Sequence, residues 1–229
     1  MSKPICIIPA RSGSVRIKDK NIYKINGKPM IAHTIKLLIN SNIFSRIVVS
    51  TDTKKIADIA RKYGAEVPFL RSKKLSNSKS TIKDTVVDVI KKIDSYNCPI
   101  HFVVYPTAIL IEKKDLVSSL GILKKESKAN SVVSVIANNS FYRSFVLKKK
   151  KEIVWRWKKF QNTMSQDLPR AYSDTGTFFL FKTKSYLKSK DMLVGPALFY
   201  EIDKFKGIDV NTQNDLLFLK LAYAKSKNK

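Results

Sequence analysis

The chain has 229 residues, of which 44 are Lys or Arg and 18 are Asp or Glu, so its formal net charge is +26. That length suits one α/β domain with a sizeable core, and a hydrophobic fraction of 44% excludes a disordered chain despite the charge. The sequence contains no apolar run of the roughly 18 residues that span a bilayer and no signal-peptide pattern, so we expect a cytoplasmic protein without a membrane partner.

Apolar runs and helical patterns alternate along the first 137 residues. The run at 4–10 is continuously apolar, which is typical of a strand buried on both faces of a parallel sheet. A helix opens at residues 27–29 and places Ile31, Ile35, Leu38 and Ile39 on one face. Further strands are predicted at 46–51, 101–105 and 131–136, and further helices at 54–63, 81–93 and 113–125. Strands that alternate with helices of this length predict an α/β fold with a parallel sheet flanked by helices.

The alternation stops after Ala137, where a basic and aromatic segment, residues 138–164, begins. Four lysines at 148–151 lie between two predicted strands and indicate a hairpin. An aromatic-rich segment inserted in this way into an α/β core is typical of a lid or a subunit contact. Strands are then expected at 177–181 and 205–210, with a last helix from Thr212. We predict a single domain, 1–229, with a small β-rich arm at 138–164.

The polar loop 11–21 directly follows the first strand. Small hydroxyl residues and one glycine let backbone amides approach an anion, and Arg11, Arg16 and Lys20 supply positive charge. The loop is neither a Walker loop nor a Rossmann glycine motif. It therefore favours phosphate binding, while a solvated basic loop remains equally open.

Two further loops follow strands. Tyr105-Pro106-Thr107-Ala108 leaves a hydroxyl at the sheet edge, although an ordinary strand-ending turn is the simpler interpretation. Asp209 and Asn211 alternate, so on an extended segment both point the same way, which suits Mg²⁺ bridging a carboxylate and substrate phosphates. A structural role for Asp209 is equally open. Thr212 and Asp215 form a capping-box pattern for the last helix.

Several catalytic classes find no support in the sequence. His33 lies within a predicted helix and His101 begins a buried strand, so both favour structural roles. Cys6 and Cys98 make neither a disulfide framework nor a metal-ligand cluster, and no Ser-His-Asp set occurs. Phosphoryl or nucleotidyl transfer needs positioning and charge rather than a protein nucleophile, and it fits best.

The high positive charge has two interpretations, a nucleic-acid surface or a biased composition. Of the 44 basic residues 36 are Lys, spread along the whole chain, whereas Arg is the residue that makes bidentate contacts with bases. Residues 148–159 are the only candidate for a basic surface with interleaved aromatics. A nucleic-acid partner is therefore not favoured, and a nucleic-acid-binding or non-catalytic protein is kept as the alternative class.

Four segments resemble one enzyme family. Residues 7–14 (IIPARSGS) with Lys20-Asn21 resemble the opening loop of the CMP-sugar synthetases, the acylneuraminate cytidylyltransferase family. Residues 27–31, 48–52 and 64–71 match that family at the same spacing, and the similarity covers nearly the whole chain. Residues 67–71, 105–108 and 165–172 look most like pseudaminic acid cytidylyltransferases.

The resemblance implies a Rossmann-like nucleotidyltransferase fold and a homodimer whose arm reaches toward the partner's active site. It also implies that a nonulosonic (sialic-acid-like) sugar, pseudaminic acid first, attacks the α-phosphate of CTP with release of pyrophosphate; N-acetylneuraminate and Kdo are the alternative sugars. By position, the nucleotide would contact Ala10, Arg11, Ser12, Gly13, Ser14, Arg16, Lys20, Asn21 and Arg71, with Arg11 and Lys20 as the catalytic pair. Tyr105, Thr107 and Gln166 would line the sugar side, and Asp209 with Asn211 would hold Mg²⁺.

The chain departs from the family pattern at four positions. Val15 stands where a lysine is usual, which removes one charge on the phosphate side, and Asn211 replaces the second residue of an Asp-x-Asp metal pair. An amide oxygen can ligate Mg²⁺ but brings no charge. Ile109 stands in place of a proline, and Asn77 in place of a common aspartate.

Overall fold

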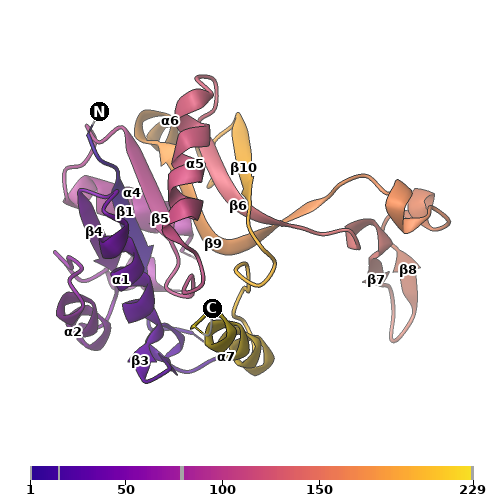
Figure 1. The fold of residues 1–229 in the computed structure, drawn as a ribbon, viewed down its shortest axis with the longest axis horizontal. Coiled ribbons are helices and arrows are strands. Elements are labelled where there is room, and N and C mark those ends of the chain that lie inside the picture. The colour runs from indigo at the N-terminus through magenta and orange to yellow at the C-terminus, as the bar shows by residue number, and fades with distance from the viewer. Residues whose placement is uncertain (1, 15, 78–79, 228–229) are drawn as a thin grey trace.

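The computed structural model describes residues 2–14, 16–77 and 80–227 (Figure 1). Val15, one of the departures noted above, lies outside the described residues. The core is a six-stranded sheet in the order β10-β6-β9-β5-β1-β4. Its strands are β1 (Ile5–Pro9), β4 (Arg46–Ser50), β5 (Ile100–Val104), β6 (Ser131–Ala137), β9 (Tyr172–Lys182) and β10 (Ala197–Glu201). All neighbours are parallel except β9, which is antiparallel to both β5 and β6. The predicted α/β fold with a mainly parallel sheet is confirmed.

Helices cover both faces of the sheet (Figure 1). They are α1 (Met30–Ser41), α2 (Lys54–Lys62), α3 (Lys73–Ser76), α4 (Ile82–Lys92), α5 (Lys113–Lys125), α6 (Thr183–Lys188) and α7 (Gln213–Lys227). Cys6 and Ile8 of β1 pack into the cluster of α1, α2 and α5, while Ile5 and Ile7 pack against α4 and α6. This two-sided burial explains why the first strand is apolar throughout.

Local signals in the sequence fix several helix ends. Thr81 and Asp84 form a capping box at the start of α4, and Thr53 caps α2. Gly64 follows α2 with φ +95°, a conformation that favours glycine. Thr212 and Asp215 bond reciprocally at the start of α7, as the sequence predicts.

The last helix packs against the segment that follows the first strand. Leu216 and Leu219 of α7 are buried against Ile17 and Met30, beside the short strands β2 (Lys24–Ile25) and β3 (Lys28–Pro29). Loop 11–21 and the segment before α7 therefore lie next to each other. This arrangement positions the site described below.

Three expectations about the elements are corrected. Residues 205–210 form no strand: Lys206 and Gly207 turn back to the carbonyl of Asp203, and Val210 packs under α7 instead of in a sheet. The strand beside β6 at one edge of the sheet is instead β10, which is not among the predicted strands: Phe199 is exposed, while its neighbours Leu198 and Tyr200 pack against the core. Ile39 is 42% exposed, so it does not belong to the buried face of α1.

The arm extends away from the sheet (Figure 1). Its hairpin is confirmed: β7 (Phe145–Leu147) pairs antiparallel with β8 (Ile153–Trp155), and short 3-10 turns η2 (Phe141–Arg143), η3 (Lys158–Phe160) and η4 (Ser165–Asp167) flank it. Leu147 and Ile153 face each other in the register and are 65% and 55% exposed. In the part of the chain that the structure describes, no helix is long and apolar enough to cross a membrane.

Candidate active site

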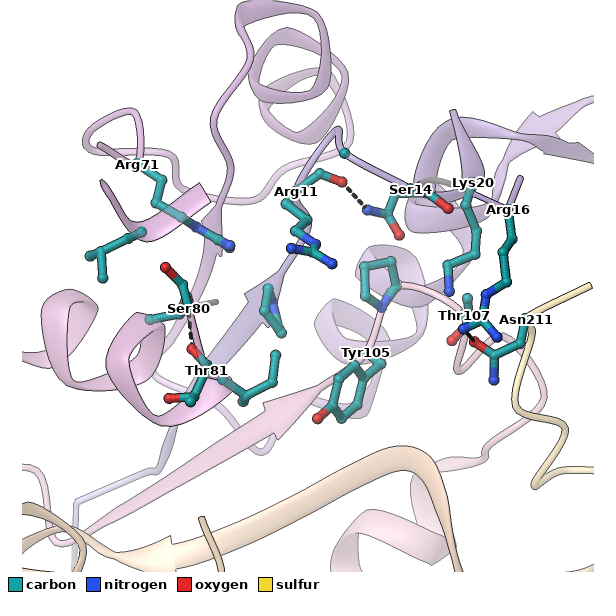
Figure 2. Close-up of a pocket in the computed structure, with 17 residues that line it drawn as sticks. Arg11, Ser14, Arg16, Lys20, Arg71, Ser80, Thr81, Tyr105, Thr107 and Asn211 are labelled. Carbon is teal, nitrogen blue, oxygen red and sulfur yellow. Dashed lines mark hydrogen bonds between the residues drawn. The ribbon is translucent and has the colours of Figure 1, made fainter. Parts of the chain in front are cut away.

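A cavity of about 410 Å³ lies beyond the carboxyl ends of β1 and β5, where parallel sheets bind their ligands. Arg71, Ser80 and Thr81 lie toward one end of the cavity and Lys20, Arg16 and Asn211 toward the other, with Arg11 and Tyr105 between them (Figure 2). The residues that line it are Pro9, Arg11, Gly13, Ser14, Arg16, Lys20, Asn21, Arg71, Leu75, Ser80, Thr81, Ile82, Thr85, Tyr105, Pro106, Thr107 and Asn211.

Loop 11–21 is held by hydrogen bonds behind the cavity. Ser12 donates from its amide and its hydroxyl to the carboxylate of Asp52, over 2.8 and 2.9 Å. Asn21 donates from Nδ2 to the carbonyl of Arg11 over 2.8 Å (Figure 2), and the amide of Ala10 donates to the carbonyl of Ser50. Ala10 and Ser12 thus anchor the loop rather than line the cavity.

Four cationic side chains face the cavity. Lys20 donates from Nζ to the carbonyl of Val210 over 2.8 Å, and burial lowers its pKa. Arg71 is 6% exposed and donates to the hydroxyl and carbonyl of Ser50, and burial lowers its pKa as well. Arg11 and Arg16 complete the set. Cations that are partly withdrawn from water interact strongly with an anionic ligand.

Tyr105 and Thr107 follow β5. Burial raises the pKa of Tyr105 above its ordinary value, and the carboxylates of Asp174 and Asp209 raise it further. Its hydroxyl therefore stays protonated and can donate a hydrogen bond. Thr107 is buried and lies near Asn211 (Figure 2). The turn between Tyr105 and Thr107 is fixed by Thr34, whose hydroxyl donates to the carbonyl of Pro106 over 2.9 Å.

Asp209 and Asn211 point the same way, as their alternation predicts, and Nδ2 of Asn211 donates to Oδ2 of Asp209 over 2.5 Å. A Cβ at Gly176 would lie 3.4 Å from Oδ1 of Asp209, so the glycine leaves the space beside that oxygen open. Among the described residues, no group of three or more His, Cys, Asp or Glu could hold a metal ion. A single carboxylate such as that of Asp209 is a ligand that Mg²⁺ takes together with substrate phosphates.

Ten of the predicted site residues line the cavity, and four do not: Ala10, Ser12, Asp209 and Gln166. Asp209 accepts a hydrogen bond from Asn211, which does line the cavity. Gln166 lies in η4, directly after the arm, is exposed, and is not among the residues lining the cavity. Sequence reasoning missed Pro9, Leu75, Ser80, Thr81, Ile82 and Thr85 as lining residues. The only signal for them is the capping box at Thr81, which begins α4 beside the cavity.

His33 and His101 have structural roles, as the sequence indicates. His33 lies within hydrogen-bond distance of the carbonyl of Ile25 and the hydroxyl of Tyr223. Nε2 of His101 lies 3.0 Å from Oγ of Ser95, and its Nδ1 lies 2.8 Å from Oγ1 of Thr183. Neither histidine lines the cavity.

Comparisons with known proteins agree with this geometry. A family model described as "Cytidylyltransferase" matches residues 5–206. The chain is 33% identical over 223 residues to a pseudaminic acid cytidylyltransferase of Campylobacter jejuni, covering 96% of both chains. It is 49% identical over 88 residues to a CMP-N,N'-diacetyllegionaminic acid synthase of Legionella pneumophila, covering 38% of each. The solved structure of a CMP:2-keto-3-deoxy-manno-octonic acid synthetase complexed with CTP superposes with a TM-score of 0.75 at 16% identity, over 98% of this chain and 100% of that one.

Proposed function

The chain belongs to the cytidylyltransferase family, and we propose that it transfers CMP from CTP to the anomeric hydroxyl of a nonulosonic acid. Pseudaminic acid is the sugar we propose first, because the relative of that name matches nearly the full length of both chains. The nearest alternatives are N-acetylneuraminate and Kdo. The observation that carries the proposal is the set of cations from loop 11–21 around a cavity at the end of β1.

Those cations suit a triphosphate. The anomeric hydroxyl oxygen would attack the α-phosphorus of CTP while the bond from that phosphorus to the bridging oxygen of the β-phosphate breaks. The CMP-sugar forms, pyrophosphate leaves and the hydroxyl proton is released. We propose that Arg11 and Lys20 stabilise the negative charge that develops, with Arg16 on the leaving pyrophosphate. No protein nucleophile is required.

The two ends of the cavity suit different parts of the substrates. We propose that Ser14 and Asn21 lie along the phosphates and that Arg71, with the hydroxyls of Ser80 and Thr81, faces the nucleoside. On the sugar side, the protonated hydroxyl of Tyr105 can donate to an oxygen of the sugar acid, with Thr107 beside it.

We propose that Asp209 and the phosphates of CTP together hold Mg²⁺, which when bound neutralises phosphate charge. The open space beside Oδ1 of Asp209 supports this assignment. The amide oxygen of Asn211, the other expected ligand, accepts a hydrogen bond from Arg16 over 2.6 Å.

We also propose a homodimer in which the arm completes the partner's site. Gln166, directly after the arm, lies outside the cavity of its own chain, and Leu147 and Ile153 expose apolar surface on the arm. An arm that crossed to a second copy would bury that surface and could bring Gln166 of the partner subunit to the sugar.

The direct test is pyrophosphate release from CTP and Mg²⁺ with pseudaminic, legionaminic and N-acetylneuraminic acids and Kdo. We expect release with CTP and not with ATP, GTP or UTP, and the highest kcat/KM with pseudaminic acid. If pyrophosphate release is fastest with another sugar, that sugar would take the place of pseudaminic acid as the proposed substrate. No release with any sugar would overturn the proposal. A salt-sensitive gel shift without CTP turnover would instead favour a nucleic-acid binder.

A further inference from the structure

Asn211 joins two side chains of opposite charge. Arg16, from loop 11–21, donates from Nη2 to Oδ1 of Asn211 over 2.6 Å. The amide nitrogen of Asn211 donates in turn to Oδ2 of Asp209 over 2.5 Å. The three side chains therefore form a chain from cation through amide to carboxylate.

The backbone around Asn211 is fixed on both sides. Its own N–H donates to Oδ2 of Asp215, in the first turn of α7, over 2.9 Å. The preceding carbonyl, of Val210, accepts from Nζ of Lys20 over 2.8 Å. Two cations of loop 11–21 thus contact adjacent residues of one short segment that α7 holds in place.

An amide is well suited to this position because it accepts on one side and donates on the other. An aspartate could accept from Arg16 but has no hydrogen to donate to Asp209, and its charge would repel that carboxylate. An alanine would leave Arg16 and Asp209 without a spacer, free to pair directly. A direct pair would withdraw the Arg16 cation from phosphate and the Asp209 carboxylate from its ligand.

We infer that Asn211 is a positioning residue that holds Arg16 and Asp209 apart and in place for CTP, and that it is not a metal ligand. The inference rests on the proposed function. Because Oδ1 of Asn211 already faces a guanidinium, a second cation at that oxygen would be repelled.

The role can be measured without metal, by calorimetric titration of CTP into the enzyme in EDTA. We expect Asn211→Ala to weaken CTP binding about three- to tenfold, since a hydrogen bond of this kind is worth that factor. In an Arg16→Ala background the same change should have an effect of less than about twofold, because the two residues act through one contact. Asn211→Asp, which keeps the acceptor and loses the donor, should bind at least as weakly as Asn211→Ala.

Asn214→Ala is the matched control, because Asn214 is an exposed asparagine in the first turn of α7 that does not line the cavity. It should bind CTP as the unchanged enzyme does, and melting curves should show that every variant is folded. Unchanged metal-free binding by Asn211→Ala, with a raised Mg²⁺ requirement, would make Asn211 a metal ligand and overturn the inference. An equal loss of CTP affinity on Asn211→Ala in the unchanged enzyme and in the Arg16→Ala background would also overturn it. If the unchanged enzyme binds no CTP even with Mg²⁺ present, the proposed function itself fails.

Discussion

Ser12 and Asp52 are joined by two hydrogen bonds, from the amide and the hydroxyl of Ser12 to the two carboxylate oxygens of Asp52. Asp52 follows β4, and Ser12 follows the neighbouring strand β1. The carboxylate does not line the cavity. Its contacts instead fix the start of loop 11–21, from which Arg11, Arg16 and Lys20 reach the cavity.

Asp52→Ala should therefore lower kcat/KM for CTP although the residue does not touch the cavity. Hydrogen bonds to a charged group are worth roughly 1.5–3 kcal/mol, so we expect a loss of about 10- to 100-fold. Ser12→Ala keeps the amide contact and should lose less. Steady-state kinetics measures both variants, and a value for Asp52→Ala close to that of the unchanged enzyme would remove the carboxylate from loop positioning.

Lys20→Ala should lower kcat about 10²–10³-fold, the usual effect of removing one preorganised donor from a developing negative charge. The ammonium of Lys20 is partly buried, which lowers its pKa and strengthens its attraction for phosphate. Lys18→Ala is the control: Lys18 is exposed, belongs to the same loop and does not line the cavity. Equal losses in the two variants would mean that only the general charge of the loop matters.

The sequence predicts the elements well where one local signal decides them. The strands and helices that alternate up to Ala137, the capping pair Thr212 and Asp215 and the apolar run of β1 all have the predicted places. The prediction of a strand at 205–210 is wrong because Phe205 and Val210 are residue types typical of strands. In the structure Phe205 is 67% exposed and Val210 packs under α7. The strand β9 runs antiparallel because the chain returns from the arm, which periodicity cannot show.

In the site, too, local patterns in the sequence predict some residues, while others are positioned only by long-range packing. The cations of loop 11–21 are adjacent in the chain and follow a predicted strand, so a pattern reveals them. The contact between Arg16 and Asn211 spans 195 positions in the sequence and depends on how α7 packs. Ser80 reaches the cavity from a loop without a motif, so only the folded chain places it there.

The arm should control assembly. Leu147→Ser with Ile153→Ser removes two exposed apolar side chains that face each other in the β7–β8 register. We expect light scattering to show a dimer for the unchanged protein and monomers for this variant, with no change in melting temperature beyond that caused by dissociation. Val117→Ser, an exposed apolar residue on α5, should remain dimeric. A monomeric unchanged protein at working concentration would contradict the proposed assembly.

Two glycines should respond to alanine with opposite signs. A Cβ at Gly207 would lie 2.7 Å from Cγ2 of Ile136 and 2.8 Å from Cγ2 of Thr175, so the chain leading to Asp209 must shift. Overpacking of this kind costs about 1–3 kcal/mol of unfolding free energy. Gly121 lies within α5 with nothing within 4 Å of its Cβ position, so Gly121→Ala should stabilise by about 0.5–1 kcal/mol. Urea unfolding compares the two variants, and a Gly207→Ala variant as stable as the unchanged protein would show that Gly207 is loosely packed against Ile136 and Thr175.

His101 should make the fold sensitive to acid. Burial lowers the pKa of His101 to about 4, while an unfolded histidine titrates near 6.5. Between these values the unfolded chain binds a proton that the folded chain does not, so stability is lost as the pH falls, by at most about 3 kcal/mol. His101→Gln carries no titrating group there and should be less stable near neutral pH, because it disturbs the contacts with Ser95 and Thr183. The difference in unfolding free energy between the two proteins should shrink toward about pH 4, since His33 is present in both and cancels. A difference that stays constant with pH would show that His101 is protonated in the folded protein as readily as in the unfolded chain.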